Sequence, residues 1–235
     1  MSTTSTMIDV PTPAGAMPAQ LSRPAGAGPF PAVVVIQEAF GLNAHIKDVG
    51  QRLAGEGYVT IAPDVFHRGG RGRTAGYDEL PKALQLMGEL TDAGIVEDVR
   101  AAVDHLRTLP YVRADRIGIT GFCMGGRVSF LAASKLPDAI AAAVPFYGGG
   151  IAPEWTATVK HPVLAFFGDQ DPFIPNEQVE TLRAEAKRLG KPVEIVVYAG
   201  APHGFFCNER DSYRPDAAKD AWARLLAFFG EHLQG

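Results

Sequence analysis

The sequence predicts a single α/β domain, a mainly parallel sheet with helices on both faces. Two observations carry this prediction. Apolar runs of strand length alternate with helical patterns along the chain, which is the pattern of βαβ units. Several of the runs, such as "PAVVVIQE" at 31–38, are apolar at almost every position, as expected of strands buried on both faces. Because nothing interrupts the alternation for long, we assign residues 30–235 to one domain.

The individual elements follow from the same patterns, taken in order along the chain. Residues 1–29 are rich in Pro, Ala and Gly, and we interpret them as an N-terminal extension of the same domain, folded as a hairpin. Helices are predicted where apolar residues recur at helical spacing, as at Val96, Val99 and Val103. The predicted strands cover 31–37, 58–62, 116–120, 140–146, 162–168 and 193–198, and the predicted helices cover 44–56, 78–90, 92–108, 124–136, 176–189 and 216–232.

Composition and charge exclude several classes of protein. The 235 residues, 46% of them hydrophobic, are enough to bury a sizeable core. A formal net charge of −4 without a Lys/Arg-rich run leaves no basic surface for nucleic acid or for a membrane. No apolar run approaches the ~20 residues that span a bilayer, and the N-terminus lacks the features of a secretory signal. We expect a cytoplasmic protein that acts on a small molecule, and we take it to be a monomer.

One of the two cysteines stands in an unusual frame. In "RIGITGFCMGGRVSF", residues 116–130, Cys123 lies between a predicted strand and a predicted helix, with Gly121, Gly125 and Gly126 around it. Glycines let a strand and a helix approach closely at a sharp turn, and the unpaired N–H groups of a helix N-terminus favour an anion. A buried cysteine usually acts as a small hydrophobic residue, but this frame favours a nucleophile.

Cys207 lacks such a frame and is interpreted as structural, and the sequence leaves a disulfide between Cys207 and Cys123 open. No other Cys/His pair besides Cys207 and His203 has a spacing like that of zinc ligands. A dinucleotide fingerprint would need a glycine where Cys123 stands, and a phosphate loop of the GxxxxGK type is absent. We therefore predict no metal site, no dinucleotide site and no phosphate loop.

The carboxyl ends of other predicted strands supply an acid and a base, and ligands of open parallel sheets bind at this edge. Asp169 and Asp171 both follow one strand, and His203 follows the last strand. The order cysteine, acid, histidine is that of the α/β-hydrolase architecture. We therefore predict a catalytic triad of Cys123, Asp171 and His203, with Asp169 as the alternative acid.

Two further features belong to the same edge of the predicted sheet. Glu38 ends the apolar strand at 31–37, where partial loss of solvent tends to raise the pKa of a carboxyl group. We predict that Glu38 is a second acid/base group beside the thiol; the alternative is a salt-bridged or exposed strand end. The turn at Cys123 directs the backbone N–H of Met124 toward the substrate, and the N–H of Ala39 is the expected second donor of an oxyanion hole.

Together these motifs resemble the dienelactone hydrolase family (carboxymethylenebutenolidases) of α/β-hydrolases. The resemblance runs from "VVVIQEAFGLN" through "YVTIAPDVFHR", "IGITGFCMGGR" and "GDQDPFIP" to "PHGFF". It implies attack on an ester or enol-lactone carbonyl, an acyl-enzyme and hydrolysis by water, without a cofactor. Position by position, it implies Cys123 as nucleophile, His203 as base, Asp171 as the acid that orients it, Glu38 as the group that exchanges a proton with the thiol, and the N–H groups of Met124 and Ala39 as the oxyanion hole.

The sequence departs from the family at the residues that would bind substrate. Family members that act on dienelactone hold the substrate carboxylate with two arginines. Arg210 matches the arginine that follows the catalytic histidine. The other arginine has no counterpart, because none lies between positions 74 and 99, and Arg71, Arg73 or Lys82 would have to substitute for it. Lysine would offer a carboxylate only a point contact.

The leading hypothesis is therefore the cysteine-dependent hydrolysis of a small ester or enol-lactone. One alternative is a general carboxylesterase that acts on neutral acyl esters. Another is a non-catalytic binding or sensor module in which Cys123 is a redox-sensitive thiol. Because a sensor has no need of a base and an acid that orients it, the full set of residues favours an enzyme.

Overall fold

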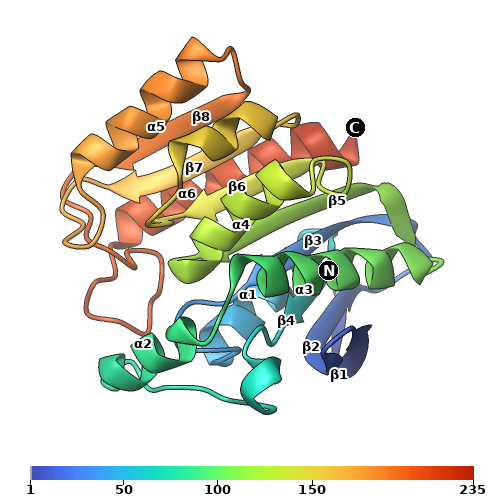
Figure 1. Cartoon of the computed structure of the whole chain (residues 1–235). Helices are drawn as coiled ribbons and strands as arrows, with labels where there is room; N and C mark the ends of the chain where they lie inside the picture. Colours follow the sequence, from blue (N-terminus) through green and yellow to red (C-terminus); the bar gives the residue numbers. More distant parts are fainter. Residues whose placement is uncertain (1) are drawn as a thin grey trace.

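Within residues 2–235, which the computed structural model describes, eight strands form one sheet (Figure 1). The strands are β1 (Thr3–Thr12), β2 (Gly15–Pro24), β3 (Phe30–Ile36), β4 (Val59–Pro63), β5 (Val112–Phe122), β6 (Ala142–Phe146), β7 (Val163–Gly168) and β8 (Val193–Tyr198). Their order across the sheet is β1-β2-β4-β3-β5-β6-β7-β8. The six strands β4, β3, β5, β6, β7 and β8 pair in parallel with their neighbours in this group. β2 pairs antiparallel with both β1 and β4. The predicted α/β class with a mainly parallel sheet is confirmed.

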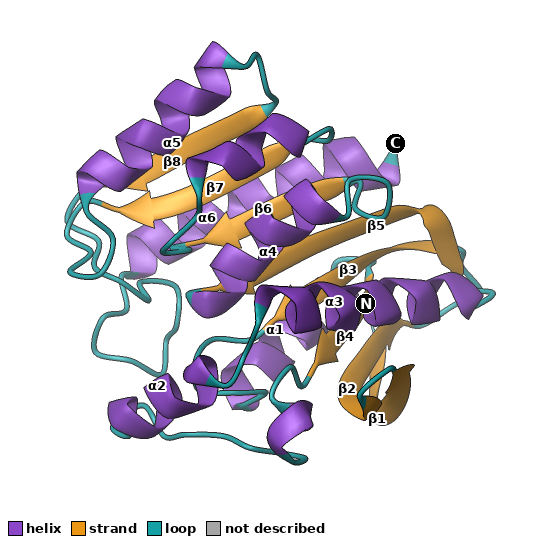
Figure 2. Cartoon of the chain, in the orientation of Figure 1, coloured by secondary structure: helices purple, strands orange, loops and turns teal. Residues whose placement is uncertain are grey.

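Helices cover both faces of this sheet, as predicted. They are α1 (Ala44–Gly55), α2 (Leu80–Gly88), α3 (Asp92–Thr108), α4 (Met124–Lys135), α5 (Asn176–Arg188) and α6 (Pro215–Phe229), with the short turns η1 (His67–Gly69), η2 (Pro153–Thr158) and η3 (Gly230–Gln234). Figure 2 shows α3, α4 and α5 in front of the sheet and α1 and α6 behind it. The buried apolar side chains of the strands and of both helical layers form one continuous core.

Local signals explain where several helices begin. The side chain of Asn43 accepts a hydrogen bond from the N–H of Ile46 at the start of α1, and Thr91 does the same for Gly94 at the start of α3. Such caps pair N–H groups that the first helical turn leaves free. Pro215 occupies the first turn of α6, where its missing N–H removes no helical hydrogen bond.

One strand is longer than the sequence pattern predicted. β5 begins at Val112 rather than at 116, and Val112 pairs with Phe30 of β3 before the register shifts. Residues 113–116 are polar or small and are exposed or partly exposed. No apolar run therefore marks this part of the strand, and the prediction of its start was wrong.

The amino-terminal residues enlarge the same sheet. β1 and β2 form a hairpin whose register runs from Thr3 opposite Pro24 to Thr12 opposite Gly15, and β2 pairs with β4. Met17 of β2 is buried in the core, whereas β1 is largely exposed. Across residues 2–235, no helix combines the length and the apolar character needed to cross a membrane.

Candidate active site

The carboxyl ends of β3, β5, β7 and β8 meet on one side of the sheet, at the left in Figure 1. Cys123 directly follows β5, Glu38 lies two residues beyond β3, and Asp171 and His203 lie in the loops after β7 and β8. The parallel topology therefore brings together side chains that are far apart in the sequence. All four are buried or partly buried.

Cys123 occupies a strained turn between β5 and α4. Its φ of 57° and ψ of −116° lie in a region that non-glycine residues adopt at a cost of about 1–3 kcal/mol. A side chain on Gly121 would overlap the carbonyl of Gly125, and a side chain on Gly125 would lie 2.6 Å from the carbonyl oxygen of Gln37. The two glycines thus let β5, α4 and the end of β3 approach one another around the thiol, as the sequence predicted.

His203 is held by a buried carboxylate. Its Nδ1 donates to Oδ2 of Asp171 over 2.7 Å, and Oδ1 of Asp171 accepts from the N–H groups of Phe173 and Ile174 at 2.8 and 3.1 Å. Asp169, the alternative acid, instead accepts from the N–H of Gly200 at 2.7 Å. The structure therefore pairs His203 with Asp171, and Asp169 ties together two loops.

The imidazole of His203 has an unusual affinity for a proton. Burial acts against the charged form, but hydrogen bonds to Asp171 and to Cys123 outweigh it and raise the pKa of His203 to about 9. At neutral pH the ring is therefore mainly an imidazolium beside the thiol. A positively charged imidazole next to a cysteine is the arrangement found at reactive thiols.

Glu38 is completely buried beside this pair. Its Oε1 accepts from Nη1 of Arg210 at 3.3 Å, and its Oε2 has no hydrogen-bond partner within 3.5 Å among the described residues. Burial raises the pKa of Glu38, although the charges of Arg210 and His203 act in the opposite direction. Both sequence-based alternatives are thus partly present, because Glu38 is salt-bridged and is also a desolvated carboxyl group.

Arg210 is the predicted substrate-binding cation that reaches this cluster. Its guanidinium lies 5.3 Å from the ring centroid of Phe40 and 5.5 Å from that of Tyr77. It passes so close to Gly204, whose φ is +76°, that a Cβ there would overlap the guanidinium. Only a glycine after His203 therefore lets Arg210 approach Glu38.

The other three predicted cations are not brought to the site. Arg71 pairs with Asp9 at 2.6 Å, Arg73 pairs with Glu89 at 2.8 Å, and Lys82 pairs with Glu79 at 3.2 Å. These ion pairs lie at or near the surface, on the loop before α2 and on α2 itself. None of the three side chains contacts Cys123, His203 or Glu38 through the interactions of residues 2–235.

The two predicted oxyanion donors lie where the elements converge. Met124 is the first residue of α4, so its N–H has no acceptor within the helix. Ala39 follows Glu38 directly, and the first turn of α4 packs against the end of β3 through Gly125. Both residues are buried.

Sequence reasoning missed two tyrosines that contact the cluster. The hydroxyl of Tyr77 accepts from Nδ2 of Asn43 at 3.0 Å and from Sγ of Cys207 at 3.2 Å. Tyr147 is fully buried, has a φ of +36°, and places its ring 5.0 Å from that of His203. The one available signal was the position of Tyr147 at the end of β6, before three glycines.

Cys207 lies in the interior of the protein and forms no disulfide. It is buried, both cysteines of the chain are free thiols, and desolvation raises the pKa of Cys207 to about 11. The disulfide that the sequence left open is therefore not formed. No cluster of three or more His, Cys, Asp or Glu side chains in residues 2–235 is arranged to hold a metal ion.

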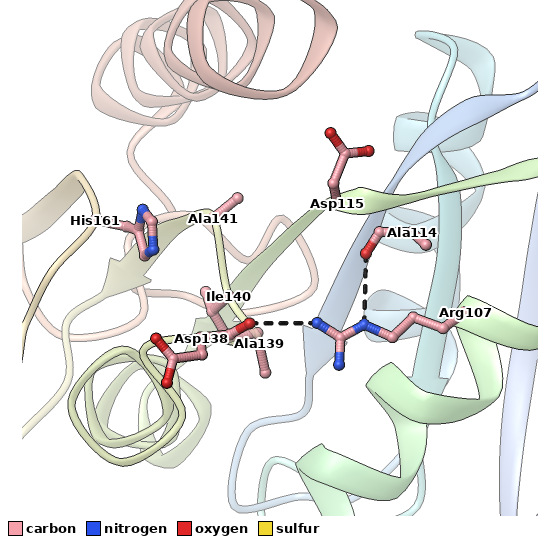
Figure 3. A pocket seen from close by; sticks show the side chains of 8 residues that line it. All are labelled: Arg107, Ala114, Asp115, Asp138, Ala139, Ile140, Ala141 and His161. Carbon is pink, nitrogen blue, oxygen red and sulfur yellow. Dashed lines mark hydrogen bonds between the residues drawn. The ribbon is translucent and has the colours of Figure 1, made fainter.

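A separate hollow of about 410 Å³ lies at the opposite, amino-terminal end of the strands (Figure 3). Arg107 points into it, but its guanidinium already donates to the carbonyls of Ala114 and Asp138 at 3.4 and 3.3 Å. Because ligands of open α/β sheets bind at the carboxyl ends of the strands, the cluster around Cys123 is the candidate active site.

Comparisons with known proteins cover nearly the whole chain. The model of the dienelactone hydrolase family matches residues 17–233. A protein of Synechocystis sp., provisionally assigned as a carboxymethylenebutenolidase, is 36% identical over 242 residues, which cover 97% of each chain. A crystal structure from Klebsiella pneumoniae, provisionally assigned as a dienelactone hydrolase, has a TM-score of 0.92 at 34% identity and covers 98% of this chain and 100% of its own. A dienelactone hydrolase-like promiscuous phosphotriesterase from metagenomic libraries has a TM-score of 0.86 at 26% identity, with 99% of both chains covered.

Proposed function

The chain belongs to the dienelactone hydrolase family and is a hydrolase of ester or lactone bonds, and from that premise we propose that Cys123 is its nucleophile. The substrate is a small ester or enol-lactone, and the reaction passes through an acyl-enzyme. The observation that carries the proposal is the position of His203, which is hydrogen-bonded to Asp171 and interacts electrostatically with Cys123 at a strained turn. A thiol with a base, an acid that orients the base, and a helix N-terminus beside it is the arrangement of nucleophilic catalysis.

In the acylation step, Sγ of Cys123 attacks the carbonyl carbon as a thiolate while the proton resides on His203. The negative charge that develops on the carbonyl oxygen is stabilised by the N–H groups of Met124 and Ala39, each worth about 3 kcal/mol of barrier lowering. When the tetrahedral intermediate collapses, Nε2 of His203 gives its proton to the leaving oxygen. The C–O bond breaks and a thioester on Cys123 remains.

In the deacylation step, a water molecule attacks the thioester carbonyl. Nε2 of His203, neutral after acylation, takes a proton from this water, and the same two N–H groups stabilise the second oxyanion. Collapse of the intermediate releases the carboxylic acid and restores the pair of Cys123 and His203. Asp171 keeps the imidazole in the orientation and tautomer that both steps need.

Before substrate binds, Glu38 is the proposed group that exchanges a proton with the thiol of Cys123. Burial raises the pKa of Glu38 and so favours its protonated form more than in an exposed carboxyl group, and we propose that it exchanges a proton with Cys123. The bond from Arg210 to Oε1 controls this exchange, because a positive charge favours the ionised carboxylate.

A second candidate, a general carboxylesterase acting on neutral acyl esters, is favoured by one specific observation. Each of the four cations predicted to bind a substrate carboxylate is paired with an acidic side chain of the protein itself: Arg71, Arg73, Lys82 and Arg210. A carboxylate on the substrate would have to compete with those partners. The thiol-sensor alternative is disfavoured, because a sensor does not need the base His203 or its acid Asp171.

One chain supplies every residue of this machinery, so we propose that the enzyme works as a monomer, which light scattering would check. A catalytic thiol must stay reduced, which favours a reducing compartment such as the cytoplasm.

The proposal is tested by measuring the hydrolysis of cis-dienelactone and of p-nitrophenyl acetate with the wild type and with Cys123→Ala. We expect the wild type to hydrolyse at least one of the two and the variant to hydrolyse neither. A Cys123→Ala enzyme with the wild-type rate would eliminate the cysteine mechanism. The ratio of the two wild-type rates separates the candidates, because a carboxylesterase for neutral esters would favour p-nitrophenyl acetate.

A further inference from the structure

Phe173 is the most exposed large apolar side chain among residues 2–235, with 62% of its surface accessible. Single exposed apolar residues are common on proteins, but the position of this one is specific. Its ring meets that of His203 edge to face, with 5.2 Å between the centroids and 88° between the planes. Its backbone N–H donates to Oδ1 of Asp171.

Two aromatic rings therefore contact the imidazole of His203, and they differ in their exposure. Tyr147 is fully buried and lies 5.0 Å from His203. Phe173 faces solvent over most of its surface. A ring that touches the imidazole and still offers a free apolar surface is positioned to contact a molecule bound beside His203.

The proposed mechanism says which part of the substrate lies there. Nε2 of His203 protonates the leaving oxygen, so the alcohol portion of an ester must sit next to the imidazole when the C–O bond breaks. The acyl portion is held on the other side of the reacting carbon, where its oxygen meets the N–H groups of Met124 and Ala39. Phe173 therefore lies within reach of the leaving group.

We propose that Phe173 is a specificity-determining residue that packs against a flat apolar leaving group, so that the enzyme prefers aryl esters to alkyl esters. The inference rests on the proposed function. An aryl ring suits this position because it can stack on, or meet edge to face, the exposed phenyl ring, which a saturated chain cannot do. The preference originates in binding, because the contact exists before the C–O bond breaks.

The test compares two acetates whose leaving groups have similar acidity, phenyl acetate and hexafluoroisopropyl acetate. Both give the same acetyl–Cys123 intermediate, so a difference in kcat/KM reports acylation alone. For Phe173→Ala we expect kcat/KM for phenyl acetate to fall about tenfold, mainly through KM. The value for hexafluoroisopropyl acetate should change less than about twofold, and Phe173→Leu should lie between the two enzymes.

Met7→Ala is the matched control, because Met7 is also an exposed apolar residue, at 52%, but lies on β1 at the far edge of the sheet from β7. It should leave both rates unchanged. The N–H of residue 173 remains in Phe173→Ala, so the bond to Asp171 and the fold should persist, as circular dichroism would verify.

Two results would overturn the inference while leaving the proposed function intact. Equal losses on both acetates would mean that Phe173 acts only by holding Asp171 and His203. An unchanged rate ratio in Phe173→Ala would mean that the ring does not touch the leaving group. A wild type that hydrolyses neither these acetates nor cis-dienelactone, or that hydrolyses them no faster than Cys123→Ala, would instead mean that the proposed function itself fails.

Discussion

Cys123 and Cys207 place the same thiol group in two opposite surroundings. Cys123 is partly exposed, sits at a positive φ between β5 and α4, and interacts electrostatically with His203. Cys207 is fully buried and donates to the hydroxyl of Tyr77, and burial raises its pKa to about 11. The comparison teaches that the reactivity of a thiol depends on its environment: Cys123 is next to a cation and a helix N-terminus, whereas Cys207 is desolvated, bonded to a hydroxyl and near the carboxyl group of Glu38.

The largest difference should appear when each thiol loses its hydrogen-bond partner. His203→Gln removes the base beside Cys123, and we expect kcat/KM for a hydrolysed ester to fall at least about 10⁴-fold. Tyr77→Phe removes the acceptor beside Cys207, and the loss should stay below about tenfold, since the hydroxyl of Tyr77 is bonded to Asn43 and Cys207 rather than to Cys123 or His203. Equal losses in the two variants, measured by steady-state kinetics, would contradict the contrast between the cysteines.

The second difference concerns alkylation by iodoacetamide at pH 7. A thiol with a pKa of about 11 holds about one part in 10⁴ as thiolate at that pH. Cys123 lies beside the imidazolium of His203, and we expect it to react at least about a thousandfold faster than Cys207. Mass spectrometry of peptides over time measures both rates. Comparable labelling of the two cysteines in the folded protein would show that His203 does not activate Cys123.

The smallest expected difference lies in the pH ranges over which His203 and Cys207 affect the stability of the fold. The folded pKa of His203 is raised from 6.5 to about 9. Its contribution to the free energy of unfolding is therefore complete below about pH 6.5 and is lost as pH rises through 9. The loss amounts to at most about 3 kcal/mol. The folded pKa of Cys207 is raised from 9 to about 11. The free energy of unfolding that this thiol contributes is therefore also lost as pH rises, but between pH 9 and 11.

Chemical denaturation at each pH separates the two windows. In His203→Gln, the free energy of unfolding should vary less with pH between pH 6.5 and 9. In Cys207→Ala, it should vary less only above pH 9. A wild-type protein whose free energy of unfolding rises from pH 6.5 to 9 would show that His203 is not stabilised as an imidazolium.

Much of the fold could be predicted because its signals are local. The apolar runs that became β3, β4 and β7 and the spacing within α3 depend on neighbouring residues alone. The start of β5 was missed for the same reason, since residues 113–116 are polar or small, and Val112 belongs to the strand only because it pairs with Phe30 of β3 across a register shift in the folded sheet.

The sequence by itself determined the turn at Cys123, because glycines at 121, 125 and 126 are the condition for β5 and α4 to meet there, and that condition is written within six residues. It also determined the order of nucleophile, acid and histidine along the sheet edge. Only the tertiary structure decided that Asp171 rather than Asp169 reaches His203, that Arg210 pairs with Glu38 from 172 positions away, and that Phe173 lies against the imidazole. These contacts join separate loops, whose paths depend on how the whole sheet twists and packs, and such long-range geometry leaves no periodic signal in the chain.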